Sequence, residues 1–170
     1  GLTFEDFTVK SYKLPPGGYV AKCQSQVNGS KGESGFSILP PFDVAALKRR
    51  LDDVRNSLSP GSYTTLEFTI EEIEAGLKEL YPYETAAPQR IKISRLIDYI
   101  EEAEAGNDQF ARRREFVRMA YRSKLDTTLQ PYVVWIPQDF DPNRKYPLLV
   151  FLHGSASTET DIVGWQNVIP

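Results

Sequence analysis

The chain contains the stretch Leu148-Leu149-Val150-Phe151-Leu152-His153-Gly154-Ser155-Ala156-Ser157, in which five consecutive apolar residues run into a loop of small ones. A continuous apolar run of this length is typical of a strand that is buried on both faces. Small side chains after such a strand let the backbone N–H groups approach a ligand closely. The stretch therefore predicts a buried strand over Leu148–Leu152 and, after it, a loop that presents backbone donors.

Two further strands are predicted upstream of this run. Tyr121 to Lys124 and Pro131 to Ile136 contain many aromatic and β-branched residues, and Asp126 to Thr128 forms a turn between them. A polar turn, Asp139 to Arg144, then leads to the apolar run. The last part of the chain, residues 119–170, is therefore predicted to form the first strands of an α/β sheet.

Residues 1–118 are predicted to form a mixed, helix-rich region. Apolar residues recur at helical spacing over 44–58, 70–80 and 93–100, and a fourth helix is predicted from Asp108 to Phe116. Ser59-Pro60-Gly61 is interpreted as the end of the first helix, and Tyr63 to Phe68 as a short strand. The pattern Thr69-Ile70-Glu71-Glu72 has the form of a capping box and predicts that the second helix begins there.

A strand and a flexible hairpin loop are predicted ahead of these helices. Tyr19 to Val27 alternates loosely and indicates a strand, and the turn formers of 28–32 follow it. The segment Asn28-Gly29-Ser30 also fits the acceptor sequence for N-glycosylation, which stays an alternative to a plain loop.

The end of the chain resembles a known catalytic domain. Three spaced segments carry the likeness: Tyr121-Arg122-Ser123-Lys124-Leu125-Asp126, Gln130-Pro131-Tyr132-Val133-Val134-Trp135-Ile136-Pro137 and Tyr146-Pro147-Leu148-Leu149-Val150-Phe151-Leu152-His153-Gly154. Together they resemble the start of the catalytic domain in α/β-hydrolase-fold esterases and prolyl-oligopeptidase-like peptidases, over about residues 119–165. The resemblance implies that residues 1–118 are an accessory region.

The resemblance also implies roles for the loop after the apolar run. In that family the loop supplies a backbone N–H to the oxyanion hole, which points here to the backbone of Gly154, Ser155 and Ala156, with Ser155 as the best single candidate. His153 corresponds to the family's loop-structuring histidine and not to its catalytic base. The implied partner is a small ester or peptide substrate.

The catalytic residues of such an enzyme are missing from this sequence. It has no G-x-S-x-G nucleophile elbow, and His153 is its single histidine. A Ser-His-Asp triad therefore cannot be completed here, and we expect a truncated catalytic domain with no catalytic residue of its own. A complementing C-terminal segment would supply the triad.

Composition excludes several other classes. With 20 Lys and Arg against 23 Asp and Glu, the net charge is −3, which does not indicate a nucleic-acid-binding protein. A local basic cluster follows an acidic helix and is interpreted as a solvated, salt-bridged surface; its members are Arg112-Arg113-Arg114, Arg118, Arg122 and Lys124. One Cys and one His leave too few ligands for a zinc site, so no metal and no cofactor are expected. No apolar segment is long enough to span a membrane, and a secreted or periplasmic location is favoured.

Two alternatives to a hydrolase fragment remain open at this point. Residues 1–118 could form a non-catalytic binding or interaction module, which would be compact without further sequence. The protein could also be a hydrolase-like protein that has lost its activity. The fragment hypothesis differs from the module in leaving Leu148–Leu152 exposed.

Overall fold

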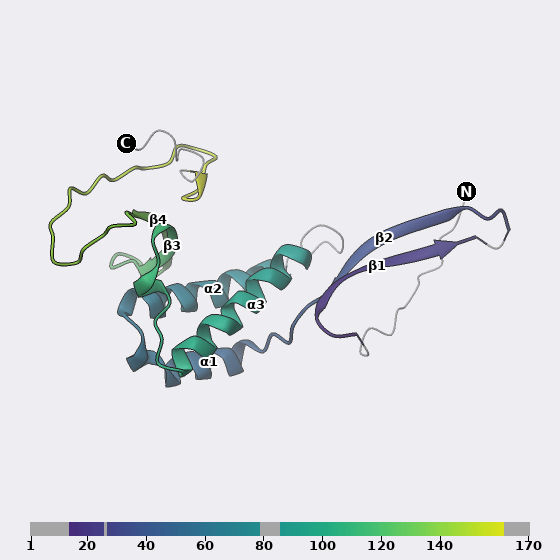
Figure 1. The fold of residues 1–170 in the computed structure, drawn as a ribbon, viewed down its shortest axis with the longest axis horizontal. Helices are drawn as coiled ribbons and strands as arrows, with labels where there is room; N and C mark the ends of the chain where they lie inside the picture. The colour runs from purple at the N-terminus through teal and green to yellow at the C-terminus, as the bar shows by residue number, and fades with distance from the viewer. Residues whose placement is uncertain (1–13, 26, 79–85, 162–170) are drawn as a thin grey trace. The chain divides into compact units, whose positions relative to one another are not determined.

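The computed structural model describes residues 14–25, 27–78 and 86–161 (Figure 1). The elements follow one another along the chain as β1 (Gly17–Gln24), β2 (Lys31–Ile38), α1 (Val44–Asp53), η2 (Arg55–Ser57), α2 (Pro60–Lys78), α3 (Ala86–Glu104), η3 (Phe110–Arg112), β3 (Glu115–Arg122) and β4 (Leu129–Ile136), where η marks a short 3-10 helix. Among the described residues the strands form two antiparallel pairs, β1 with β2 and β3 with β4. The predicted mixture of helices and strands is confirmed.

The chain divides into two compact units. The described parts of Gly1–Asp43 and Ile73–Arg95 form the first unit, and those of Val44–Glu72 and Leu96–Pro170 form the second. The boundary predicted near residue 118 falls inside β3, opposite Val133 of β4. The division into an accessory region, 1–118, and the start of a catalytic domain, 119–170, stays a prediction.

The first unit contains the β1–β2 hairpin, which confirms a strand followed by a turn, although β1 ends at Gln24 and β2 already begins at Lys31. The register pairs Tyr19 with Phe36, and their rings stack with centroids 5.5 Å apart. It also pairs Lys22 with Glu33, whose charged groups lie 3.1 Å apart. Such cross-strand pairs stabilise a two-stranded sheet. The turn contains Gly29 at φ 69°, a conformation that glycine adopts without strain.

The second unit has a core to which both its helices and β3 contribute. Its buried apolar residues are Leu47, Leu51, Val54, Leu66, Ile70, Leu96, Ile100, Ala103, Phe110, Val117 and Ala120. The helical members recur three or four residues apart, so each helix presents one apolar face. The helical spacing seen in the sequence at 44–54 and 93–100 is thereby confirmed.

Ser59-Pro60-Gly61 begins α2, so its interpretation as a stop for the preceding helix was wrong. The Ser62 amide donates to Ser59 Oγ over 3.2 Å, which makes Ser59 an N-cap residue. Pro60 is the first helical residue, where its missing N–H has no partner to lose. The helix before it, α1, already ends at Asp53.

The strand predicted from Tyr63 to Phe68 and the capping box at Thr69 were also wrong, because both segments lie inside α2. The Thr69 hydroxyl donates to the carbonyl of Thr65 over 2.8 Å, one helical turn back, and caps no helix start. Leu66 and Ile70 are both completely buried and lie four residues apart. Burial on this helical face outweighs the β-propensity of Tyr63, Thr64 and Phe68.

The third helix was predicted correctly, and the fourth was not. Pro88 lies in the first turn of α3, and Gly106, at φ 81°, follows the end of that helix. Between Asp108 and Phe116 the described chain forms the single turn η3 and then enters β3 at Glu115. The carboxylate of Asp108 accepts the amides of Phe110 and Ala111, at 3.1 and 3.3 Å, and so closes one turn without propagating a helix.

Asp108 also fastens the start of α2. Its Oδ2 accepts the Ser59 amide at 2.9 Å, and its carboxylate accepts the hydroxyl of the completely buried Ser62 at 2.8 Å. Burial opposes ionisation of Asp108, but these donors and the Ala111 amide outweigh burial and hold the pKa of the carboxyl below its ordinary value. A negative charge at a helix N-terminus also interacts favourably with the helix dipole.

Asp108→Asn is expected to destabilise the protein by about 1 to 2 kcal/mol at neutral pH, because an NH2 group replaces one of two oxygens that both accept hydrogen bonds and leaves a donor unpaired. Because the native pKa is lowered, the contribution of Asp108 is complete above the ordinary pKa of Asp, near 4, and is lost as the pH falls through the native value. Urea unfolding of both proteins from pH 7 to pH 3 measures this. The two stabilities should converge in acid, and a difference that is constant with pH would contradict the assignment.

The β3–β4 hairpin confirms the strand predicted from Pro131 to Ile136. The strand predicted from Tyr121 to Lys124 was placed too late, because β3 spans Glu115–Arg122 and shares only Tyr121 and Arg122 with it. The register runs from Glu115 opposite Ile136 to Arg122 opposite Leu129. The Asp126 carboxylate accepts the amide and hydroxyl of Thr128 within the turn, at 3.2 and 2.8 Å. A local side-chain cap of this kind is why Asp favours turns.

The apolar run Leu148–Leu152 forms no strand in this structure, so that prediction was wrong. The five side chains are 57–85% exposed, whereas the apolar pattern alone predicts burial on both faces and the fragment hypothesis predicts an exposed sheet edge. An isolated strand cannot pair its backbone groups or cover its side chains, and none of the described strands lies in a ladder with this run. No helix among the described residues is long and apolar enough to cross a membrane.

Candidate functional site

The residues predicted to supply backbone donors lie on one exposed turn. The Ser157 amide donates to the carbonyl of Gly154 over 3.3 Å, and Ala156 has φ 61°. A positive φ at the third residue is the signature of a type II turn, with Ser155 in the second position. Within the described part of the chain, the amides of Gly154, Ser155 and Ala156 have no acceptor, so all three remain available to an anionic oxygen.

His153 lies against the same turn. Its Nδ1 is 3.0 Å from the carbonyl oxygen of Gly154, a hydrogen bond that requires the proton on Nδ1. The imidazole is exposed. This contact is compatible with a loop-structuring role, which stays a prediction together with the oxyanion roles of Gly154, Ser155 and Ala156.

The segment after the turn is closed by Asp161. Its Oδ2 accepts the Thr158 amide at 3.0 Å, and its own amide donates to the Thr158 carbonyl over 3.2 Å. The Thr158 amide, the Ser157 hydroxyl and the nearby His153 lower the pKa of Asp161. The sequence 153–161 is therefore a small closed loop held by its own side chains; we refer to it as the 153–161 loop.

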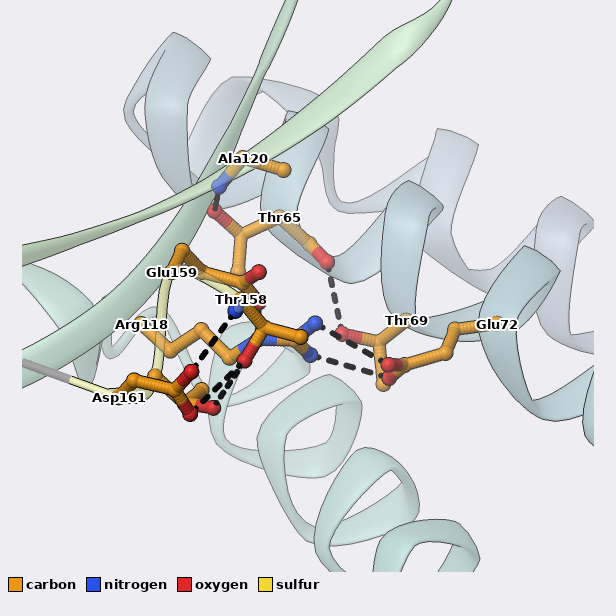
Figure 2. A network of polar contacts seen from close by, with 9 residues as sticks. Thr65, Thr69, Glu72, Arg118, Ala120, Thr158, Glu159 and Asp161 are labelled. Atoms are coloured by element: carbon orange, nitrogen blue, oxygen red, sulfur yellow. Dashed lines mark hydrogen bonds and ion pairs between the residues drawn. The ribbon is translucent and has the colours of Figure 1, made fainter. Parts of the chain in front are cut away.

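An arginine on β3 connects this loop to α2, as Figure 2 shows. Arg118 Nε donates to Glu159 Oε1 over 2.7 Å. The two terminal nitrogens of Arg118 donate to the carboxylate of Glu72, at 3.0 and 3.1 Å. The guanidinium also lies over the ring of Phe68, 5.1 Å from its centroid.

The three charged groups of this network are partly withdrawn from water. The side chains of Arg118, Glu72 and Glu159 are 35%, 26% and 18% exposed. Burial opposes the positive charge, but donation to Glu72 and Glu159 outweighs it and raises the pKa of Arg118 above its ordinary value. Arg118 is therefore always charged, and two carboxylates balance it.

Two more contacts fix β3 against α2. The Ala120 amide donates to the hydroxyl oxygen of the buried Thr65 over 2.9 Å (Figure 2). That hydroxyl donates to the Gly61 carbonyl over 2.7 Å. Arg122 forms an ion pair with Glu67 of α2, with 2.7 Å between Nη2 and Oε2. The strand that carries Arg118 is therefore held in place on its helix independently of the loop.

The basic cluster is a salt-bridged surface only in part. Arg118 and Arg122 form ion pairs with carboxylates, whereas Arg113 and Arg114 lie over aromatic rings. Arg113 stacks on Tyr99 and Phe110 and donates to the Tyr99 hydroxyl, and Arg114 lies over Phe140. The neighbouring acidic helix α3 pairs instead with Arg50 of α1. Arg50 Nε lies 2.7 Å from Glu104 Oε1, and Arg50 Nη2 lies 4.0 Å from Glu101 Oε1.

The structure brings together residues that the sequence did not connect. His153, Gly154, Ser155 and Ala156 were found from local sequence. Arg118, which contacts the loop at Glu159, lies 41 residues before it, and Glu72, which contacts Arg118, lies 87 residues before it. No local pattern marks such pairs. Among the described residues, no group of three or more His, Cys, Asp or Glu side chains could hold a metal ion.

Comparison of this chain with protein-family models, curated proteins and solved structures finds no match. The likeness to α/β-hydrolases thus rests on the three segments within residues 119–165 alone. Function is therefore argued from the loop, the apolar run and their surroundings.

Proposed function

We propose that this chain is the N-terminal part of a serine hydrolase, a carboxylesterase or peptidase, whose Ser-His-Asp triad is supplied by polypeptide outside it. The observation that carries the proposal is the direct connection between an exposed apolar run and a turn with free amides. Leu148–Leu152 leads without interruption into the turn of Gly154, Ser155 and Ala156.

The exposure of the apolar run supports an incomplete sheet. Soluble proteins rarely leave contiguous large apolar side chains in water, because burying such surface gains about 25 cal/mol per Å². All five side chains here are more exposed than covered. Parallel strands on both sides and helices on both faces would bury them, and a complementing C-terminal segment would provide these elements.

The turn has the chemistry that acyl transfer needs. When a serine attacks an ester or amide carbonyl, negative charge develops on the carbonyl oxygen. Fixed backbone N–H groups stabilise that charge more than they stabilise the neutral substrate, so they lower the barrier. The left-handed Ala156 adds support, since strained non-glycine residues cluster at functional sites.

The test compares this chain with the same chain continued through a G-x-S-x-G segment and the Asp and His that follow it in the triad. With p-nitrophenyl acetate, we expect no hydrolysis by the 170 residues and turnover by the continued chain. The matched control is the continued chain with its nucleophilic serine replaced by alanine. Hydrolysis by the 170-residue chain, or inactivity of the continued one, would contradict the proposal.

A binding module would give a different result in the same preparations. It should be a cooperative monomer whose amides over residues 132–152 exchange slowly with solvent. A hydrolase fragment should exchange quickly at Leu148–Leu152 and become protected when the chain is continued. Hydrogen exchange with size-exclusion chromatography separates the two.

A further inference from the structure

We propose that Arg118 is a positioning residue that holds the 153–161 loop against β3 and α2, and so orients the amides of its turn. The oxyanion role of these amides rests on the proposed function. The ordering of the loop by Arg118 is independent of that function. We infer this role from the position of the Arg118 guanidinium, which donates to the carboxylates of both Glu72 and Glu159.

Glu72 fixes the orientation of the Arg118 guanidinium independently of the loop. The carboxylate of Glu72 accepts both terminal nitrogens, a bidentate arrangement that leaves the guanidinium little freedom. Phe68 lies beneath it. The remaining donor, Nε, is thereby directed at Glu159.

Glu159 is the point where the loop receives this contact. Its side chain is 18% exposed, although its neighbours Thr158 and Thr160 are exposed. The Asp161 carboxylate holds Thr158, and Ser157 closes the turn onto Gly154. A constraint at Glu159 therefore reaches the free amides through the backbone and these two hydrogen bonds.

The chain offers a matched control for this ion pair. Arg122 and Glu67 also join β3 to α2, four strand residues from Arg118 and five helix residues from Glu72, with their charged groups 2.7 Å apart. The second contact of Arg122 is the carbonyl of Thr127, in the β3–β4 turn. Removing this pair changes the attachment of strand to helix without touching the 153–161 loop.

The experiment measures backbone order by nitrogen-15 relaxation in the 170-residue chain and in Glu159→Gln, Arg118→Gln and Arg122→Gln variants. In the unsubstituted chain, the amides of 154–161 should have order parameters near those of β3, about 0.85. In Glu159→Gln and Arg118→Gln they should fall below about 0.6, while α2 and β3 keep their values. Arg122→Gln should leave the loop unchanged.

Two results would overturn the role of Arg118. One is a loop that is already disordered in the unsubstituted chain, and the other is a loop that keeps its order in Glu159→Gln. Because Glu159 is outside the core, its substitution should not unfold the protein, even if Arg118→Gln does. An inactive continued chain with an Arg118-dependent loop would refute the proposed function and leave this inference standing.

Discussion

Replacing Ser155 with proline in the continued chain is expected to lower kcat by about 10²–10³, the usual effect of losing one oxyanion donor. Ser155 is the second residue of the turn closed by Gly154 and Ser157, and proline is favoured at that position of a type II turn. The substitution therefore removes one N–H and keeps the backbone path. Steady-state kinetics with p-nitrophenyl acetate measures the loss, which should appear in kcat with KM little changed.

Ser155→Ala is the matched control, because it removes the hydroxyl and keeps the amide. Its kcat should stay within a few-fold of the unsubstituted enzyme, since the donor in question belongs to the backbone. If the alanine variant is as impaired as the proline variant, the hydroxyl carries the function and the assignment of the amide is wrong. If neither is impaired, the turn lies outside the oxyanion hole.

The sequence predicted those elements whose signals are local and repeated. Apolar spacing predicts the helices α1 and α3, and the turn residues between β3 and β4 predict a hairpin. The Ser59-Pro60-Gly61 segment contains breakers that also begin helices, and Ser59 directly before Pro60 was the available sign of an N-cap. Once α2 is known to start there, the strand at Tyr63 has no room.

The site was predictable only in its local part. A loop of small residues after an apolar run identifies Gly154 and Ser155 as potential donors, whatever surrounds them. The partnership of Arg118 with Glu72 and Glu159 depends on how β3 lies on α2, which no periodicity encodes. The apolar run Leu148–Leu152 is the reverse case. Its local pattern predicts a strand, but the part of the chain that the structure describes offers that strand no pairing partner.

Leu66→Ala is expected to destabilise the protein by about 2 to 5 kcal/mol, a large share of the 5 to 15 kcal/mol typical of a domain. Leu66 is completely buried and shares a face of α2 with Ile70, so the substitution leaves a cavity in the core of the second unit. Urea unfolding followed by circular dichroism at 222 nm measures the change. The same substitution at Leu125, which is 98% exposed in the β3–β4 turn, should alter stability by less than about 0.5 kcal/mol.

Phe68→Ala separates the helix from the strand that the sequence predicted here. In a strand, Leu66 and Phe68 would share one face and be buried together, so both substitutions would be similarly damaging. In α2, Phe68 is turned about 200° from Leu66 and is partly exposed beneath Arg118. Phe68→Ala should therefore cost clearly less than Leu66→Ala despite the larger side chain. Equal losses at the two positions would contradict the helix, because only period-two packing gives Leu66 and Phe68 the same environment.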